Sequence, residues 1–401
     1  MSLQYVQSWI RNKTRAAFLT VGVFACGIAP LSSADVILHA FNWSYEEIGS
    51  KAQEIKDLGY KKVLVAPPLK SNKGNCAWWA RYQPQDYRVI EHCLGNKETF
   101  QAMISALADK NIETYADIVL NQMANERFNS TVFPGDDAVQ DYVSYPDYWE
   151  RQRLFGSLND NLFGSDDFHG WDQNLRDGYC IQNYNDWWQS MNGRICGESP
   201  DLGMPDLNPN SWVLQQQRSY LSAIKAMGVT GFRIDAAKHM TIDHINSMYT
   251  PEIKSGMHLF GEIIVDDRAG DNAGFDNFLS PYLNYTNHSA YDLPLFKTIR
   301  EALGFGGSMN ALANPESWGG GIGSRGVTFA ITHDIPTNGG FRYQILSEQD
   351  EHLAYAYIMG RADGVPMVLS DKTGTDAGRW VDDYKQGNIT AMVDFHNRVQ
   401  G

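Results

Sequence analysis

The stretch that decides the fold is SWVLQQQRSYLSAIKAMGVTGFRID, residues 211–235. An amphipathic pattern predicts a helix over 211–227, Gly228 ends it, and the run GFRID that follows predicts a short strand. Parallel strands are joined by crossovers that are usually helices, so a helix leading directly into a strand is typical of a parallel sheet. The stretch therefore predicts an α/β fold.

The same alternation runs along most of the chain. Further helices are predicted over 46–58, 97–110, 293–302, 348–359 and 389–399, and further strands over VILHAF (36–41), KKVLVAPP (61–68), TYADIVL (114–120), LFGE (259–262), VTFAI (327–331) and VPMVL (365–369), with FDNFL (275–279) as a weak additional strand. The total approaches eight strands. That number favours a closed (β/α)8 TIM barrel over an open sheet.

The alternation stops between Gln122 and Pro205, after the third predicted strand. This interval is rich in Asn, Asp, Gly, Trp and Tyr, and it is too long for a loop in a compact domain. We predict an inserted small domain over 122–205, between the third strand and the third helix. The barrel would then consist of residues 35–121 and 206–401.

The first 34 residues differ from the rest of the chain. Three basic residues precede the apolar run AAFLTVGVFACGIA (16–29), and small residues follow it at 32–34. This order is typical of a secretory signal, and the apolar run is too short to span a bilayer. We predict a signal peptide over 1–34 and a secreted protein, extracellular or periplasmic. The alternatives are a buried N-terminal helix and a lipid on Cys26.

The overall composition excludes several classes of function. The chain has 401 residues, a formal net charge of −14, 43% hydrophobic and 12% aromatic residues. Such a sequence folds and is not disordered or fibrous. Its negative charge repels nucleic acid phosphates and anionic membrane surfaces, so we expect neither nucleic acid nor lipid as a partner. A neutral or cationic ligand fits better.

Four cysteines remain beyond the predicted signal: Cys76, Cys93, Cys180 and Cys196. An even number in an exported protein predicts two disulfides, for which three connectivities exist. We favour the sequence-local pairs Cys76–Cys93 and Cys180–Cys196, because each closes a loop of fewer than twenty residues in a turn-rich region. A zinc site is the weaker interpretation, because no C-x-x-C or H-x-x-H pair lies nearby.

Carboxylates gather where the predicted strands end. In a TIM barrel the active site lies at the C-terminal ends of the strands, and Asp235, Glu262 and Asp334 occupy such ends. Two carboxylates suffice for glycoside hydrolysis with retention of configuration, and a third can orient the sugar. For any single residue the alternatives are a solvated loop acid or an Arg–Asp pair closing a strand.

Five blocks of the sequence resemble those of the α-amylase family, glycoside hydrolase family 13, in the family's order and spacing: DIVLNQ (117–122), MPDLN (204–208), GFRIDAAKH (231–239), GEII (261–264) and FAITHD (329–334). The resemblance implies that Asp235 is the nucleophile, Glu262 the general acid/base and Asp334 the third carboxylate. It implies calcium-dependent endo-hydrolysis of α-1,4 bonds in starch and maltooligosaccharides. The alternatives are a transglycosylase and a non-catalytic glucan-binding member.

The residues around the carboxylates also have predicted roles in positioning them or in binding the sugar. Arg233 lies two residues before Asp235 and so on the same face of the strand, where it can hold that carboxylate ionised. By resemblance, Asp117 and His333 surround the sugar before the scissile bond, and Lys238 and His239 reach the leaving-group side. Trp79, Tyr82 and Gln83, in the segment WWARYQP, resemble the family's sugar-stacking platform. A core role for Trp78 is equally favoured.

The sequence also predicts a calcium site whose ligands are oxygen atoms. By resemblance these are the side chains of Asn121 and Asp206 and the backbone carbonyl of His239, with a further carbonyl from Arg194. Calcium prefers such oxygen ligands. The alternative is that Asp206 caps the helix that starts near residue 211.

The sequence departs from the family pattern in three places. Gln122 follows Asn121 where the family usually has His, and an amide can donate a hydrogen bond but never carry charge. Thr332 and Met367 occupy positions that form the chloride site in related members, so we expect no chloride site. The chain after Asp334 suffices for the last strand and helix, and we expect no C-terminal β-sandwich. We expect a monomer.

Overall fold

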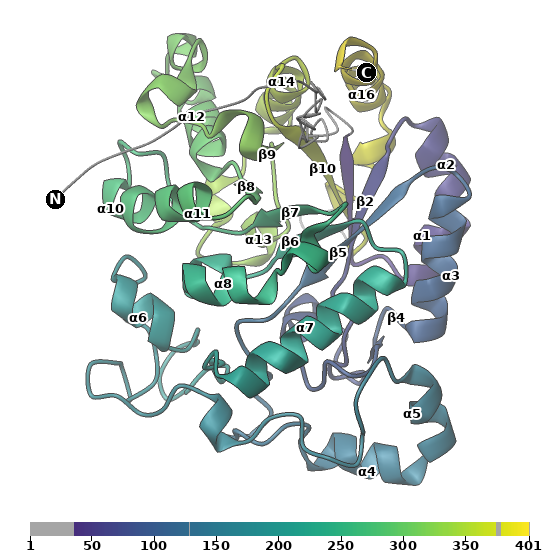
Figure 1. Cartoon of the computed structure of the whole chain (residues 1–401). Helices are drawn as coiled ribbons and strands as arrows, with labels where there is room; N and C mark the ends of the chain where they lie inside the picture. The colour runs from purple at the N-terminus through teal and green to yellow at the C-terminus, as the bar shows by residue number, and fades with distance from the viewer. Residues whose placement is uncertain (1–35, 128, 374–377, 401) are drawn as a thin grey trace, which may run out of the picture. The chain divides into compact units, whose positions relative to one another are not determined.

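A closed barrel of eight parallel strands forms the centre of the computed structural model, which describes residues 36–127, 129–373 and 378–400 (Figure 1). In chain order the strands are β1 (Ile37–Phe41), β2 (Lys62–Val65), β5 (Glu113–Ile118), β6 (Gly231–Ile234), β7 (His258–Gly261), β8 (Ser289–Tyr291), β9 (Gly326–Phe329) and β10 (Val365–Asp371). β1 pairs with both β2 and β10, which closes the sheet. The predicted TIM barrel is confirmed. The predicted signal peptide and Cys26 lie outside the described residues.

The strands read as almost continuous apolar runs because they are buried on both faces, by the barrel interior and by the surrounding helices. β1, β2 and β6 are buried at every position. In the β5–β6 pair Asp117 lies opposite Arg233, so the register brings two charged side chains side by side inside an apolar barrel. Buried charges are costly unless they are paired, so this register points to a functional site.

Helices follow the strands, and the six predicted helical ranges are among them. They are α1 (Tyr45–Ser50), α2 (Ala52–Asp57), α3 (Lys97–Ala108), α4 (Asp136–Ser144), α5 (Pro146–Gln152), α6 (Trp187–Asn192), α7 (Ser211–Ala226), α8 (Ile242–Met248), α9 (Pro251–Lys254), α10 (Asn272–Gly274), α11 (Ser280–Tyr285), α12 (Leu293–Leu303), α13 (Asp334–Thr337), α14 (Glu348–Met359) and α16 (Gly387–Gln400). The side chain of Asn210 caps α7 by accepting a hydrogen bond from the Val213 N–H. Asp206 is therefore not the cap of this helix.

Two predicted elements are wrong in detail. FDNFL is a π-helical turn (Phe275–Leu279), and the sixth barrel strand is β8, only three residues long. The two phenylalanines of FDNFL are three residues apart, which is a helical spacing, and three residues are too few to show an alternating pattern. The predicted helix over 46–58 is two short helices, α1 and α2, separated at Lys51.

The long interval after β5 leads away from the barrel and returns at α7. It contains α4, α5 and α6, which Figure 1 shows away from α12, α14 and α16. Both predicted disulfides are present, Cys76–Cys93 after β2 and Cys180–Cys196 inside the interval. The limits 122 and 205 of the inserted domain stay predictions. In the described part of the chain, every helix is too short or too polar to cross a bilayer.

Candidate active site

A cleft of about 780 Å³ opens where the barrel strands end. Asp235 directly follows β6, Glu262 directly follows β7, and Asp334 begins α13. All three predicted carboxylates line this cleft, together with seven of the predicted substrate-binding residues: Trp79, Tyr82, Gln83, Gln122, Lys238, His239 and His333. Residues from distant parts of the sequence therefore converge as the family blocks predict.

Arg233 is the centre of the charged floor of the cleft. It is fully buried on β6, and its Nη1 lies 2.7 Å from Asp235 Oδ1 and 2.8 Å from Asp117 Oδ1. Its Nη2 contacts Glu262 Oε1. One guanidinium group thus binds three carboxyl groups. Asp117 and Arg233 lie beneath the cleft and do not line it, so they position the carboxylates above them.

The backbone fixes the two carboxylates that follow β6 and β7. The Asp235 N–H donates to Ile118 O at 2.9 Å, and the Glu262 N–H donates to Ile234 O at 3.0 Å, which extends the sheet by one residue on each strand. Ala236 then turns the chain with φ +48°, in the left-handed region that is uncommon for a residue other than glycine. Its N–H donates to Glu262 Oε2 at 3.2 Å, so the turn also orients the neighbouring carboxyl group.

Burial dominates the electrostatics of the floor. Desolvation raises the pKa of Asp235 well above its ordinary value, and the positive charge of Arg233 opposes that rise. Desolvation likewise raises the pKa of Asp117, again opposed by Arg233. Burial and the nearby Glu262 raise the pKa of Asp334 to about 7. At Asp235 burial therefore outweighs the charge of Arg233, contrary to the prediction that this arginine holds the carboxylate ionised.

The two adjacent tryptophans both line the cleft but differ in exposure. Both belong to the 3-10 helix Trp78–Tyr82, in which Trp79 is 45% exposed while Trp78 is half-buried against Phe41. The ring of Tyr82 stacks on His333 with a centroid distance of 5.5 Å, and its hydroxyl donates to Asp117 Oδ2 at 2.9 Å. Trp79 thus presents an exposed aromatic face at the cleft, and Tyr82 is anchored nearby; their role in sugar stacking stays a prediction.

The other end of the cleft contains Lys238, His239 and Tyr184. Lys238 Nζ donates to the carbonyl of Ile264 at 2.8 Å, and burial lowers the pKa of this lysine to about 8. The His239 ring packs edge-on against Tyr184 and its Nδ1 lies 3.2 Å from Ser190 O. The inserted segment therefore supplies one wall of the cleft.

Gln122 occupies the position where the sequence departs from the family. Its Nε2 donates to Tyr82 O at 3.2 Å and lies 3.4 Å from Asp235 Oδ2. Its Oε1 is buried and has no hydrogen-bond partner within the described residues. The amide thus provides a neutral donor beside Asp235, as the sequence predicts.

The predicted calcium ligands lie away from the cleft, with the exception of His239. Gln122 and Asp206 form an isolated antiparallel β-bridge, and the Leu207 N–H donates to Asn121 O at 2.9 Å. These contacts bring the Asn121 and Asp206 segments together. Asp206 is 2% exposed, its Oδ1 lacks a partner in the described chain, and His169 Nδ1 lies 2.5 Å from Oδ2. Burial raises the pKa of Asp206 to about 6. An unpaired buried carboxylate oxygen is a fitting ligand for a hard cation.

Arg194, the last member of the predicted calcium set, is compatible with this interpretation. The carbonyl of Arg194 accepts one hydrogen bond, from the Ile181 N–H at 3.1 Å, and retains a second lone pair. The described residues contain no group of three or more His, Cys, Asp and Glu side chains arranged for a metal. The predicted site would need only one carboxylate, so this finding does not bear on it.

Sequence reasoning missed several residues of the cleft. Tyr184, Asn125, Ile264, Phe341 and the segment 195–204 all contribute to its lining. Ile264 lies two residues after Glu262, so the strand-end pattern could have found it. The others lie in irregular loops, where no periodic pattern marks the residues that face the cleft.

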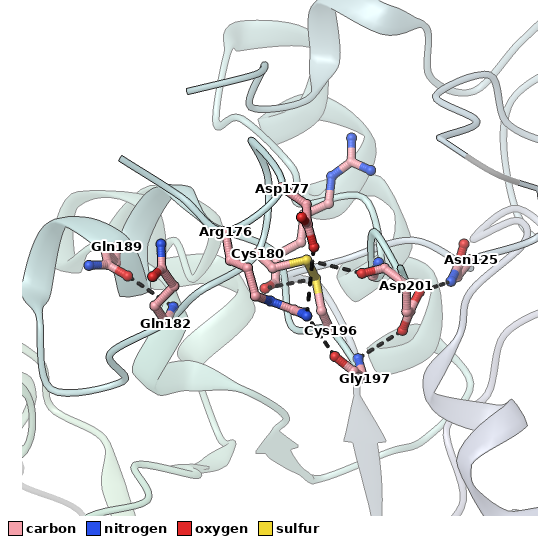
Figure 2. Close-up of a disulfide and its surroundings, with 11 residues drawn as sticks. Asn125, Arg176, Asp177, Cys180, Gln182, Gln189, Cys196, Gly197 and Asp201 are labelled. Atoms are coloured by element: carbon pink, nitrogen blue, oxygen red, sulfur yellow. Dashed lines mark hydrogen bonds and ion pairs between the residues drawn. A yellow bond between two sulfur atoms is a disulfide. The ribbon is translucent and has the colours of Figure 1, made fainter. Parts of the chain in front are cut away.

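The loop that follows Cys196 is held in place by Asp201 (Figure 2). The carboxylate of Asp201 accepts hydrogen bonds from the Gly197 N–H at 2.8 Å, the Gly203 N–H at 2.9 Å and Asn125 Nδ2 at 2.8 Å. The disulfide fixes one end of this loop to Cys180. This wall of the cleft is thus fixed by hydrogen bonds and a disulfide, although its backbone is irregular.

Comparisons with known proteins show the family to which the chain is similar. Residues 45–267 match the family model described as "Alpha amylase, catalytic domain". An α-amylase of Aeromonas hydrophila is 51% identical over 391 residues, which cover 95% of this chain and 82% of that protein.

Solved structures show the same fold. Wild-type α-amylase I from Eisenia fetida superposes with a TM-score of 0.69 at 23% identity, and a mutant of that enzyme in complex with maltohexaose gives 0.67 at 22% identity. Each alignment covers 91% of this chain and 77% of the other.

Proposed function

The chain belongs to the α-amylase family of glycoside hydrolases, and from that premise we propose how its cleft performs the reaction. The substrates would be starch and maltooligosaccharides, hydrolysed internally at α-1,4 bonds with retention of configuration. The observation that carries the proposal is the contact of one buried guanidinium, Arg233, with both Asp235 and Glu262 at the floor of a large cleft.

Asp235 is the proposed nucleophile. Arg233 offsets part of the cost of its burial and aims Oδ1, while Oδ2 lies 3.4 Å from the amide donor of Gln122. In the first step the carboxylate forms a covalent bond to the anomeric carbon as the glycosidic C–O bond breaks. Arg233 stays in contact with the carboxyl group and keeps it oriented for the second step.

Glu262 is the proposed general acid/base. It gives its proton to the departing glycosidic oxygen, and it then removes a proton from the water that hydrolyses the glycosyl ester. Because Arg233 contacts both Glu262 and Asp235, it holds the two carboxyl groups close together. Retaining enzymes need such a short separation, about 5–5.5 Å between their two carboxyl groups. Asp334 would accept hydrogen bonds from sugar hydroxyls, with His333 beside it.

The residues around the reacting sugar would bind the chain on both sides. Trp79, Tyr82 and Gln83 form the platform for the glycone, while Lys238 and His239 face the leaving group. Gln122 completes the surroundings of the reacting sugar by donating a hydrogen bond. Asp117 acts indirectly, by orienting Tyr82 and Arg233.

Calcium and export are part of the same proposal. Asn121, Asp206 and the carbonyls of His239 and Arg194 would hold a calcium ion that ties the inserted segment to the barrel, and its chemistry there is structural. The unpaired Oδ1 of Asp206 supports this site. Two disulfides fit an oxidising compartment, in agreement with the secretory signal that the sequence predicts.

The anomer released first tests the mechanism. On maltoheptaose we expect the α-anomer in the proton NMR spectrum before mutarotation, with products from internal bonds. A β-anomer would refute retention. Longer products than the substrate, at the expense of glucose and maltose, would assign the chain to the transglycosylases, and no turnover at all would leave only a binding role.

A further inference from the structure

Two aromatic rings lie beside the guanidinium group of Arg233. Its Cζ atom is 5.7 Å from the centroid of the Tyr291 ring and 5.8 Å from that of the Tyr82 ring, within the range of a cation–π contact. Tyr291 stands at the end of β8 and has no role in the proposed mechanism. We propose that Tyr291 is a positioning residue, whose ring holds the Arg233 guanidinium in the orientation that serves Asp235 and Glu262.

Hydrogen bonds hold only the outer end of this guanidinium. Nη1 donates to Asp117 and Asp235, and Nη2 contacts Glu262. Nε is buried and has no hydrogen-bond partner among the described residues. A cation whose inner nitrogen lacks an acceptor needs another contact to fix it. Cation–π attraction is strongest where water is excluded, and Arg233 and Tyr291 are 0% and 1% exposed.

The Tyr291 ring is itself fixed by the strands on either side of β8. It packs against Phe260 on β7 with a centroid distance of 5.2 Å, and against Phe329 on β9 with a centroid distance of 5.4 Å. The two interplanar angles are 64° and 74°. In a close-packed interior, a ring enclosed in this way has little freedom to turn. Three strands thus determine where the ring meets the arginine.

The ring of Tyr291, and not its hydroxyl, makes the contact with Arg233. The hydroxyl oxygen lies 3.8 Å from Met367 Sδ, which is a weak acceptor. Burial raises the pKa of Tyr291 well above its ordinary value, so the hydroxyl stays protonated and supplies no negative charge to the arginine. Removal of the hydroxyl should therefore matter little, whereas removal of the ring should matter much.

The orientation of Arg233 matters because its charge opposes the rise in the pKa of Asp235 that burial causes. The charged and titratable groups around the guanidinium, besides the two tyrosines, are His39 on β1, Asp117 on β5, Asp235 after β6, Glu262 after β7, His333 just before α13 and Asp334 at its start. A displaced guanidinium would oppose burial less, so a smaller fraction of Asp235 would be ionised at a given pH. The inference rests on the proposed function, in which Asp235 reacts as a carboxylate.

The test compares Tyr291→Phe with Tyr291→Met. Phenylalanine keeps the ring without the hydroxyl, whereas methionine fills much of the space with a flexible chain and has no ring. We expect Tyr291→Phe to keep the kcat of the parent. Tyr291→Met should lower kcat on maltoheptaose about tenfold, the loss expected for one cation–π contact shielded from water. KM should change little, and the acidic limb of the kcat/KM profile should move to higher pH.

Tyr60→Met is the control for the loss of a buried aromatic ring. Tyr60 is fully buried before β2, and its ring packs against Tyr384 at a centroid distance of 6.4 Å. This variant should melt at a lower temperature than the parent, as Tyr291→Met should, but keep the parent's kcat and pH profile. Equal kcat values and pH profiles for Tyr291→Phe and Tyr291→Met would overturn the positioning role. An equal shift of the pH profile in Tyr60→Met would overturn it too.

A titration without substrate separates this inference from the proposed mechanism. Carbon-13 NMR of the carboxyl groups, assigned with Asp235→Asn and Glu262→Gln, measures their pKa values directly. The pKa of Asp235 should be higher in Tyr291→Met than in the parent and in Tyr291→Phe. That result in an enzyme without activity would refute the mechanism and keep the positioning role. The same pKa in all three proteins would overturn the role, whatever the activity.

Discussion

The floor and the walls of the cleft are built in different ways. The floor consists of Asp117, Arg233, Asp235 and Glu262, which stand on or directly after three neighbouring strands and are tied to the sheet by backbone hydrogen bonds. The walls are irregular loops, one after β2 and one in the inserted segment. Each wall loop is closed by a disulfide, Cys76–Cys93 or Cys180–Cys196.

This difference shows which contacts in the cleft require exact positions and which tolerate variation. Buried charges must be matched in position to within a few tenths of an ångström, because an unpaired buried charge is strongly destabilising. In the floor the register of the sheet provides these positions. A sugar chain is bound by hydrogen bonds and stacking that tolerate more variation, so loops suffice as walls if cross-links and bonds such as those of Asp201 limit their freedom.

The largest expected effect is that of an Asp→Asn substitution in the floor. The same substitution in a wall serves as the comparison. Asp235→Asn should lower kcat by several orders of magnitude with little change in melting temperature, because an amide cannot form the glycosyl ester. Asp201→Asn should raise KM several-fold and leave kcat near that of the parent. Activity of Asp235→Asn within tenfold of the parent, a barrier change of only about 1.4 kcal/mol, would remove Asp235 from the role of nucleophile.

The two disulfides allow the walls to be compared with each other. They close loops with sequence separations of 17 and 16 residues, so removing either by paired Cys→Ser changes should cost a similar free energy of unfolding, about 3 kcal/mol by loop entropy. Thermal denaturation measures that cost. The kinetic effects should then differ. Cys180→Ser/Cys196→Ser loosens the wall formed by residues 195–204, on the proposed leaving-group side, and Cys76→Ser/Cys93→Ser loosens the segment that carries Trp79, on the proposed glycone side. Identical effects on every substrate would mean that neither loop shapes a particular part of the cleft.

Calcium removal tests the junction between wall and floor. At free calcium about 100 times its dissociation constant, one site stabilises the native state by about 2.7 kcal/mol, so EDTA should lower the melting temperature. Asp206→Asn should abolish the response to EDTA, whereas Asp172→Asn, at another aspartate of the inserted segment, should keep it. An unchanged melting temperature in protein shown by metal analysis to be calcium-free would contradict the site.

The smallest expected effect concerns Gln122, which lies where wall and floor meet. A histidine there could carry a charge and strengthen its hydrogen bond to the sugar in the transition state, since charge-assisted bonds are roughly twice as strong as neutral ones. Gln122→His should therefore raise kcat/KM on one maltooligosaccharide several-fold, an effect of about 1 kcal/mol. A loss of activity, or a lower melting temperature, would show that the pocket is adapted to the amide that now contacts Tyr82 and Asp235.

The sequence by itself determined the barrel and the identity of its charged residues. Strands such as GFRID and helices such as 211–227 carry strong periodic signals, and the cysteine spacing was enough to predict both disulfides. The position of Arg233 two residues before Asp235 placed both side chains on one face of a strand, and the structure confirms their contact at 2.7 Å. These predictions succeed because each depends on residues close together in the chain.

The features that depend on contacts between distant parts of the chain became known only from the tertiary structure. The pattern of β8 is too short to detect, and its place in the barrel follows from pairing with β7 and β9. The contact of Arg233 with Asp117, 116 residues earlier in the chain, and the packing of Tyr184 against His239 in the same cleft both join distant segments. Local pattern fixes which way a side chain points along its own element, whereas the neighbour it meets is set by sheet register and loop packing, which no short stretch of sequence contains.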